Sequence, residues 1–170
     1  MEIRVRETGQ VMFDSEWRRY MKETTGLNFG DLDAATLDRF GADVVFEGPQ
    51  ATGGTVYQYS MRQGVEQQSD GKWYTKYVLG PIFVDRTEDG KVITADEQEA
   101  AYKAIKDAEQ AKSVRQARDE KLKSTDWVVI KHLERNENIP GVWEVYRQGL
   151  RDVPAQIGFP WNVQWPVQPE

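Results

Sequence analysis

The chain holds few residues whose type and spacing could carry out chemistry. His132 is its single histidine, and it has no cysteine. A zinc site would have to be built almost entirely from carboxylates, which is unusual, and a lone histidine without such partners is more often structural than catalytic. Carboxylate pairs such as Asp31 and Asp33 are common on soluble surfaces, and nothing singles this pair out as an acid and a base. We therefore predict no catalytic residue and no metal ligand.

Sequence patterns for nucleotide binding and acyl transfer are also missing. Gly53-Gly54 is too short for a phosphate-binding loop, and neither GxxxxGKS/T nor GxGxxG occurs. The GxSxG turn that presents a serine nucleophile is not found either. We expect no bound cofactor, and an enzyme is the least favoured class of function.

Tryptophan and proline are concentrated in residues 124–170. Four of the six tryptophans and five of the seven prolines lie there. Large aromatic side chains carry much of the area that cores and interfaces bury, whereas proline stops helices. From residue 153 onward the segment therefore cannot be regular helix, and its aromatic side chains must dock on the rest of the chain or on a partner. The sequence leaves both alternatives open.

Composition limits the partners of the chain. Its 170 residues suffice for one domain or two small ones, and its formal net charge of −6 disfavours sequence-independent binding of nucleic acid. No apolar stretch approaches the length of a membrane span, and the first ten residues lack the apolar centre of a signal peptide. We expect a cytoplasmic protein that binds neither nucleic acid nor membrane.

The N-terminal half predicts a small region of mixed α and β structure. The clearest β pattern covers residues 55–67 and 72–84, which are rich in Val, Tyr, Trp and Phe and are separated by the turn Ser69-Asp70-Gly71. Before it, alternation predicts strands at 2–6, 11–13 and 43–47. Helical spacing predicts a helix that is capped by Asp14 or Ser15, ends at Gly26 and carries Trp17, Tyr20 and Met21 on one face. A second helix is expected from Asp31 to Phe40.

The aromatic hairpin at residues 55–84 admits two interpretations. One is an ordinary sheet that covers a small core. The other is an exposed aromatic platform for a sugar or a protein. Under the second, the candidate contact residues are Tyr57, Tyr59, Trp73 and Tyr77.

A long helix is expected after the hairpin. Thr94 and Glu97 have the spacing of a capping box, and no glycine or proline occurs from there until after Lys123. The apolar stripe of this helix consists mostly of alanines, which bury little area each. The helix therefore resembles a connector or one half of a helical pair.

Two shorter helices are expected after the long one. Asp126 is predicted to cap the first of them, and Pro140 to be the first residue of the second. Trp143, Tyr146, Arg147 and Leu150 recur at i, i+3, i+4 and i+7, which places them on one helical face. The predicted fold class is α+β, with an N-terminal α+β domain at 1–94, a connecting helix at 95–124 and a C-terminal domain at 125–170.

The C-terminal residues form a long pattern of unusual composition. Thr125-Asp126-Trp127 is followed by Trp143-x-x-Tyr146-Arg147, Leu150-Arg151-Asp152-x-Pro154, Phe159-Pro160 and Val163-x-Trp165-Pro166. Over about residues 118–170 this resembles the C-terminal sequence of bacteriophage tail assembly chaperone proteins, a group close to the tail fibre assembly proteins. One departure is Val128-Val129-Ile130-Lys131, which replaces a more polar run containing proline and leaves the start of the local helix open.

The resemblance implies a protein that is not an enzyme and that helps a phage tail fibre or receptor-binding protein to fold and assemble. It implies action in the host cytoplasm, retention of some relatives at the fibre tip of the virion, and an oligomer that matches a trimeric fibre. The candidate partner contacts in the C-terminal segment are Trp127, Trp143, Tyr146, Arg147, Leu150, Arg151, Phe159, Pro160, Trp161, Trp165 and Pro166.

Two other functions remain open from the sequence. One is a permanent structural component of the virion, such as a fibre-tip or baseplate adaptor. The other is a carbohydrate-binding module that uses the aromatic hairpin.

Overall fold

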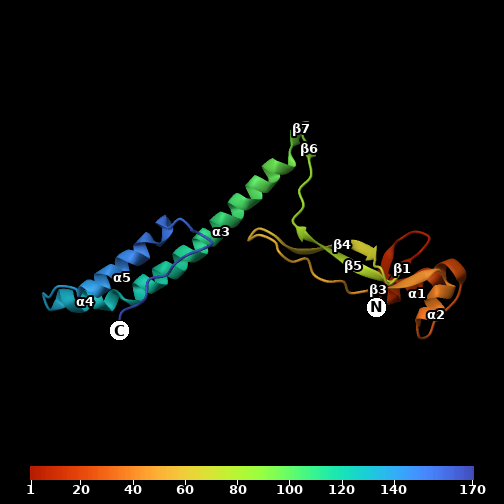
Figure 1. The fold of residues 1–170 in the computed structure, drawn as a ribbon, viewed down its shortest axis with the longest axis horizontal. Coiled ribbons are helices and arrows are strands. Elements are labelled where there is room, and N and C mark those ends of the chain that lie inside the picture. The colour runs from red at the N-terminus through yellow and green to blue at the C-terminus, as the bar shows by residue number, and fades with distance from the viewer. The chain divides into compact units, whose positions relative to one another are not determined.

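The computed structural model describes residues 1–170, which divide into two units, Met1–Ile82 and Phe83–Glu170 (Figure 1). The first unit combines a five-stranded sheet with two helices, and the second contains a small hairpin, a long helix and two shorter helices. The α+β fold class expected from the sequence is confirmed. The sequence predicts a division into domains at 1–94, 95–124 and 125–170. Whether these parts fold independently is not tested by the two units, so this division stays a prediction.

The sheet of the first unit has the strand order β2-β1-β3-β5-β4. Neighbouring strands run antiparallel except β3 and β5, which are parallel. The elements of this unit are β1 (Glu2–Val5), β2 (Val11–Phe13), α1 (Asp14–Thr25), α2 (Ala34–Arg39), β3 (Ala42–Phe46), β4 (Tyr59–Gln67) and β5 (Trp73–Gly80).

The core of the first unit lies between the sheet and its two helices. Side chains alternate between the faces of a strand, so Ile3 and Val5 of β1 point to the same side. There they join Trp17 and Met21 of α1 and Leu37 of α2 in one buried cluster. The apolar face predicted for the first helix is confirmed by the burial of its tryptophan and methionine. The expected cap is wrong, because Phe13 precedes the helix and both Asp14 and Ser15 are already helical.

Helix α2 begins later than the sequence suggested. Asp33, and not Asp31, is the residue before the first helical turn, and its carboxylate accepts a hydrogen bond from the backbone N–H of Thr36 at 2.7 Å. This bonding to Thr36 lowers the pKa of Asp33. An N-cap residue has extended backbone angles, so regular helix starts only at Ala34.

The β4–β5 hairpin is shorter at its open end than the patterns at 55–67 and 72–84 suggested. The backbone N–H of Gln58 bonds to the carbonyl of Thr55 at 3.0 Å, so a turn replaces the expected strand there. On the other side Pro81 has no N–H to continue the ladder. Between Arg62 and Val65 the register shifts at a β-bulge.

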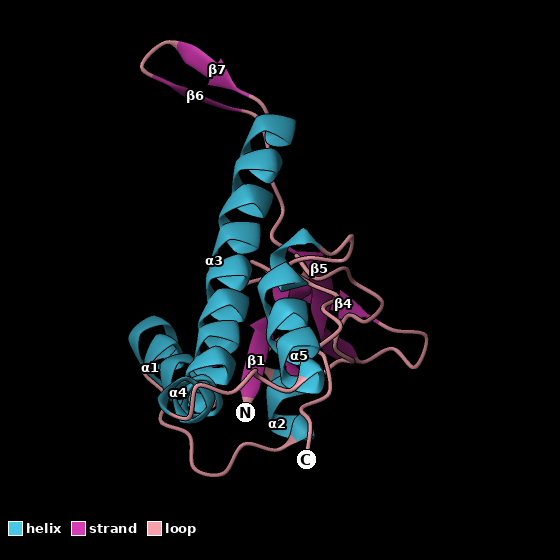
Figure 2. Ribbon diagram, turned by 90° about the vertical axis from the view of Figure 1, so that its left-hand side faces the viewer, coloured by secondary structure: helices cyan, strands magenta, loops and turns pink.

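The second unit is dominated by the helix α3 (Ala95–Ser124). The predicted capping box is confirmed, because Glu97 N–H bonds to Thr94 Oγ1 at 3.2 Å and Thr94 N–H bonds to a Glu97 carboxylate oxygen at 2.9 Å. Helix α5 (Gly141–Asp152) packs along α3 (Figure 2). The other elements are β6 (Arg86–Glu88), β7 (Lys91–Ile93), α4 (Asp126–Glu134) and the 3-10 turn η1 (Val153–Ala155).

Two expected helix starts are corrected by the structure. Thr125 is the residue before α4, and Asp126 is already helical, so Asp126 does not cap the helix. Its carboxylate instead binds Arg147, which lies 21 residues further along the chain. Pro140 precedes α5, whose first helical residue is Gly141. None of the helices combines the length and the apolar character needed to cross a membrane.

Candidate functional site

The second unit has a small core of its own at the C-terminal half of α3. Leu150 and Val153 are fully buried, and Val128 of α4 is 1% exposed. Ala111 and Val114 of α3 are buried as well, and α5 and the 3-10 turn after it run back along that helix (Figure 1). Removing a buried leucine typically costs about 2–5 kcal/mol, so this core can hold the helices together. Its apolar members are Ala111, Val114, Val128, Tyr146, Leu150 and Val153.

Arg147 joins the three helices. Its Nη1 donates to the carbonyl of Leu122 at 2.9 Å and to Thr125 Oγ1 at 2.7 Å, and its Nη2 donates to Asp126 Oδ1 at 2.7 Å. The last carbonyls of a helix have no partner within it, and a cation there is favoured by the helix dipole. Arg147 therefore caps the end of α3 from the neighbouring helix α5 and ties it to the start of α4.

Three aromatic rings extend from this junction toward the surface. Trp127 lies edge-on to Trp143, with ring centroids 6.2 Å apart, and Trp143 lies edge-on to Tyr146 at 6.1 Å. Edge-to-face pairs at this separation are favourable beyond the area they bury. Tyr146 is buried, Trp143 is half-buried and Trp127 is 55% exposed. The row therefore runs from the core to solvent.

The tail after η1 folds back on its own unit. The side-chain amide of Gln156 pairs with the backbone of Gln164 on both sides, each hydrogen bond being 2.8 Å. Between these residues, Trp161 Nε1 donates to Asp107 Oδ1 of α3 at 2.6 Å. A hydrogen bond to a carboxylate is among the stronger ones in proteins. The tail is thus closed into a loop and anchored to the long helix.

Cationic and close apolar contacts hold the rest of the tail. The guanidinium of Arg115 lies 5.2 Å from the ring centre of Phe159, and the ammonium of Lys121 lies 5.5 Å from that of Trp165. Exposed cation–π pairs contribute about 0.5–1 kcal/mol each. At Gly149 of α5 an added Cβ would meet Pro166 at 3.3 Å, which shows how closely the tail approaches that helix.

The sequence of the C-terminal part of this unit matches a known family. Residues 111–170 match the family model described as phage tail assembly chaperone protein. This segment is similar to that family. The resemblance seen over about residues 118–170 is confirmed. We call the matched residues 111–170 the chaperone segment, and it begins at Ala111, the first buried residue of α3. Neither a curated protein nor a solved structure matches the chain.

The candidate contacts on the helices of the chaperone segment differ in what a partner can reach. Tyr146, Arg147 and Leu150 are buried, so they act in the folded unit through packing and hydrogen bonds. Trp127 and Arg151 are exposed. A partner that binds the folded unit touches the exposed residues directly, and which of the candidates it uses stays a prediction.

The tail candidates share an intermediate burial. Each of them packs on the unit with one side and faces solvent with the other: Phe159, Pro160, Trp161, Trp165 and Pro166. The sequence left open whether this tail docks within the chain or on a partner, and in the structure it docks within the chain.

The hairpin candidates of the first unit do not form one aromatic platform. Trp73 and Tyr77 share a face of β5, whereas the register places Tyr59 on the opposite face. The Arg4 guanidinium covers one side of the Trp73 ring at 3.8 Å, and the Tyr77 hydroxyl donates to Glu47 at 2.6 Å. Tyr57 lies in the loop before β4 and is half-buried. These contacts favour a structural role.

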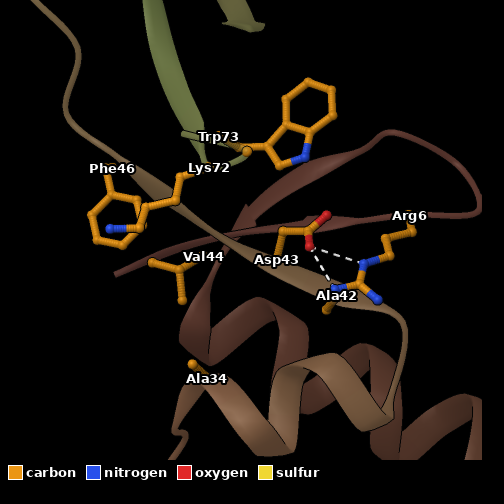
Figure 3. Close-up of a pocket in the computed structure, with 9 residues that line it drawn as sticks. Arg6, Ala34, Ala42, Asp43, Val44, Phe46, Lys72 and Trp73 are labelled. Carbon is orange, nitrogen blue, oxygen red and sulfur yellow. Dashed lines mark hydrogen bonds and ion pairs between the residues drawn. The ribbon is translucent and has the colours of Figure 1, made fainter. Parts of the chain in front are cut away.

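A pocket of about 220 Å³ opens beside Trp73 in the same unit (Figure 3). Two of its charges compensate each other, because Arg6 binds one Asp43 oxygen through Nε and Nη2 at 2.9 and 2.7 Å. Lys72 lies over the ring of Phe46 at 5.4 Å. Lys72 is exposed, so the lining holds no buried unpaired charge that would select a ligand. In the chain as a whole, no group of three or more His, Cys, Asp or Glu side chains is placed to hold a metal ion.

Sequence reasoning missed two features of the chaperone segment. The first is the binding of Thr125 and Asp126 by Arg147, although the opposite charges of Asp126 and Arg147 within one pattern were a visible clue. The second is a set of exposed valines on α5 and the tail: Val142 at 63%, Val145 at 74% and Val167 at 90% exposure.

Proposed function

We propose that the protein is a phage tail assembly chaperone that binds a tail fibre or another tail protein and assists its folding or assembly in the host cytoplasm. The observation that carries the proposal is the family match of residues 111–170, which falls on a segment with its own core and its own anchored tail. A β-rich client exposes strand edges and apolar surface until it assembles, and a binding protein can cover them. This role requires no catalytic residue.

Co-production with candidate tail proteins tests the proposal. The wild-type chain should raise the soluble yield of one of them and co-purify with it. Trp127→Ala removes an exposed aromatic side chain from the chaperone segment and should weaken the complex, whereas Ile105→Ala, at a similarly exposed position of α3, should not. If no tail protein gains solubility or is captured, the proposal is wrong.

Purified virions separate a transient chaperone from a structural component. A chaperone that leaves after assembly is absent from them by mass spectrometry, whereas a fibre-tip or baseplate adaptor is present in stoichiometric amount. The mass of the complex shows whether the number of bound chains matches a trimeric fibre.

A further inference from the structure

An open groove lies between α5 and the end of the tail. Its volume is about 550 Å³, and its lining residues are Gly141, Val142, Val145, Val167, Gln168, Pro169 and Glu170. One wall is therefore a helix face with two exposed valines, and the other is the chain beyond Pro166. We call it the α5–tail groove.

The exposure of these valines is costly unless something covers them. Val142, Val145 and Val167 are each more than 60% exposed, and nothing in the unit packs over them. Each buried apolar side chain of this size typically contributes about 1.5–3 kcal/mol relative to exposure, so an apolar partner gains from filling the groove. Grouped exposed apolar side chains next to polar ones are typical of protein-binding surfaces.

The backbone of the tail wall indicates the conformation of the occupant. Val167 and Gln168 have no regular secondary structure, and their N–H and C=O groups form no hydrogen bond within the chain. An extended segment can pair with such groups through its own backbone, as in strand addition, whereas a helix has already used its backbone groups. The wall thus favours an extended occupant.

Spacing agrees with an extended occupant. Residues two apart on one face of a strand are separated by about 6.8 Å. Val142 and Val145 are three apart on a helix, which places their Cβ atoms about 5–6 Å from each other. Alternate apolar side chains of an extended segment can therefore contact both valines in turn.

Charge indicates what flanks the apolar side chains. Glu170 is the single charged residue among those lining the groove. No basic side chain lines the groove. A lysine or arginine at one end of the occupant is therefore favoured over an acidic residue.

We propose that the α5–tail groove binds an extended segment of the client protein, with apolar side chains at alternate positions and a basic residue at an end. The inference rests on the proposed function, since it names the surface and the chemistry by which the chaperone segment holds its client. An extended apolar segment is what an unassembled β-rich protein exposes.

Fluorescence anisotropy with labelled peptides tests the groove in the full-length chain. The probe is Lys-Thr-Val-Thr-Val-Thr-Val-Lys, compared with the same peptide carrying Glu at both ends and with one in which the threonines are prolines. We expect the lysine peptide to bind about twofold to fivefold tighter than the glutamate peptide, as exposed ion pairs allow. The proline peptide should bind more weakly still, because each proline removes a backbone N–H that is available for pairing.

Two variants of equal charge locate the binding. Val145→Asp places a carboxylate in the groove, and Ile105→Asp places one at an exposed position on α3, so both chains carry the same net charge. Both sites are more than half exposed, and circular dichroism confirms that each variant is folded. Val145→Asp should lose about tenfold or more in affinity for the lysine peptide, and Ile105→Asp should bind like wild type.

Each outcome bears on the groove. Absence of peptide binding to wild type, or equal affinities of the two variants, overturns the proposal. A chain that binds no peptide but still captures a tail protein refutes the groove and leaves the proposed function standing. A chain that binds the peptide through Val145 but captures no tail protein supports the chemistry of the groove and contradicts the proposed function.

Discussion

Arg147 offers the sharpest test of how the chaperone segment is held together. Arg147→Met keeps most of the side-chain volume and removes all three hydrogen bonds that join α5 to the junction of α3 and α4. The arginine side chain is 11% exposed, whereas that of its ionic partner Asp126 is 54% exposed. Replacing Arg147 should therefore lower the free energy of unfolding by more than replacing Asp126.

The magnitude depends on which groups lose a partner. The bonds to Leu122 and Thr125 come from a charged, buried donor and are expected to contribute about 1.5 kcal/mol each, the low end for charged groups, because both acceptors keep other hydrogen bonds. The pair with the half-exposed Asp126 adds less than about 1 kcal/mol. Arg147→Met should thus destabilise the second unit by about 3 kcal/mol, and Asp126→Ala by less than about 1 kcal/mol.

Urea unfolding followed by tryptophan fluorescence measures both variants. Four of the six tryptophans lie in the second unit, so the signal reports mainly on it. A double-mutant cycle with Arg147→Met and Asp126→Ala isolates their interaction, which should be below about 1 kcal/mol. If Arg147→Met costs less than Asp126→Ala, or if neither lowers the midpoint, the assignment of Arg147 as the cap of α3 is wrong.

Three further predictions address the tail and the hairpin. Deleting residues 160–170 should lower the melting temperature of the isolated protein, because it removes the Trp161–Asp107 hydrogen bond and the packing of Pro166 on Gly149. An unchanged melting temperature would show that the tail does not stabilise the unit without a partner. Gly149→Leu should push the tail away from α5 and make Trp165 more accessible to acrylamide quenching, while Gln148→Leu, the neighbouring exposed position, serves as its control. At the hairpin turn, hydrogen bonds from Lys72 N–H and then from the Tyr74 hydroxyl lower the pKa of Asp70, and the same carboxylate raises the pKa of Tyr74. The stabilisation from Asp70 is therefore present above its unfolded pKa of about 3.9 and is lost as the pH falls through its lower folded pKa. The stabilisation from Tyr74 is lost as the pH rises above about 10. In a plot of the free energy of unfolding against pH, Asp70→Asn should flatten the acid part.

Local patterns predicted those parts of the fold that depend on neighbouring residues. The Trp143, Tyr146, Arg147 and Leu150 face came from helical spacing, and the capping box at Thr94 came from a residue pair three apart. In both cases the interacting groups lie within two helical turns. Short-range geometry is therefore enough to predict them.

Contacts between residues far apart in the chain could not be predicted from the sequence, because they depend on how the helices and the tail fold back. Asp126 has the residue type of an N-cap, and only the return of α5 brings a guanidinium to its carboxylate. The acceptor and the cation that hold the tail, Asp107 and Lys121, look like ordinary solvated charges on a polar helix. Exposed valines at 142 and 145 are unremarkable singly, and the groove arises only when the tail runs beside them.

The boundary of the chaperone segment falls inside α3, sixteen residues after that helix begins. Within a helix, each inserted residue rotates the downstream part of the chain by about 100° about the helix axis. An insertion of seven residues therefore nearly restores the original orientation, whereas an insertion of two turns the downstream part to the opposite side. We therefore predict that the segment can be joined to a protein that ends in a helix, with the heptad as the unit of linker length. The anchoring carboxylate Asp107 lies four residues before that boundary, so a transplant must carry it along to keep the tail fastened.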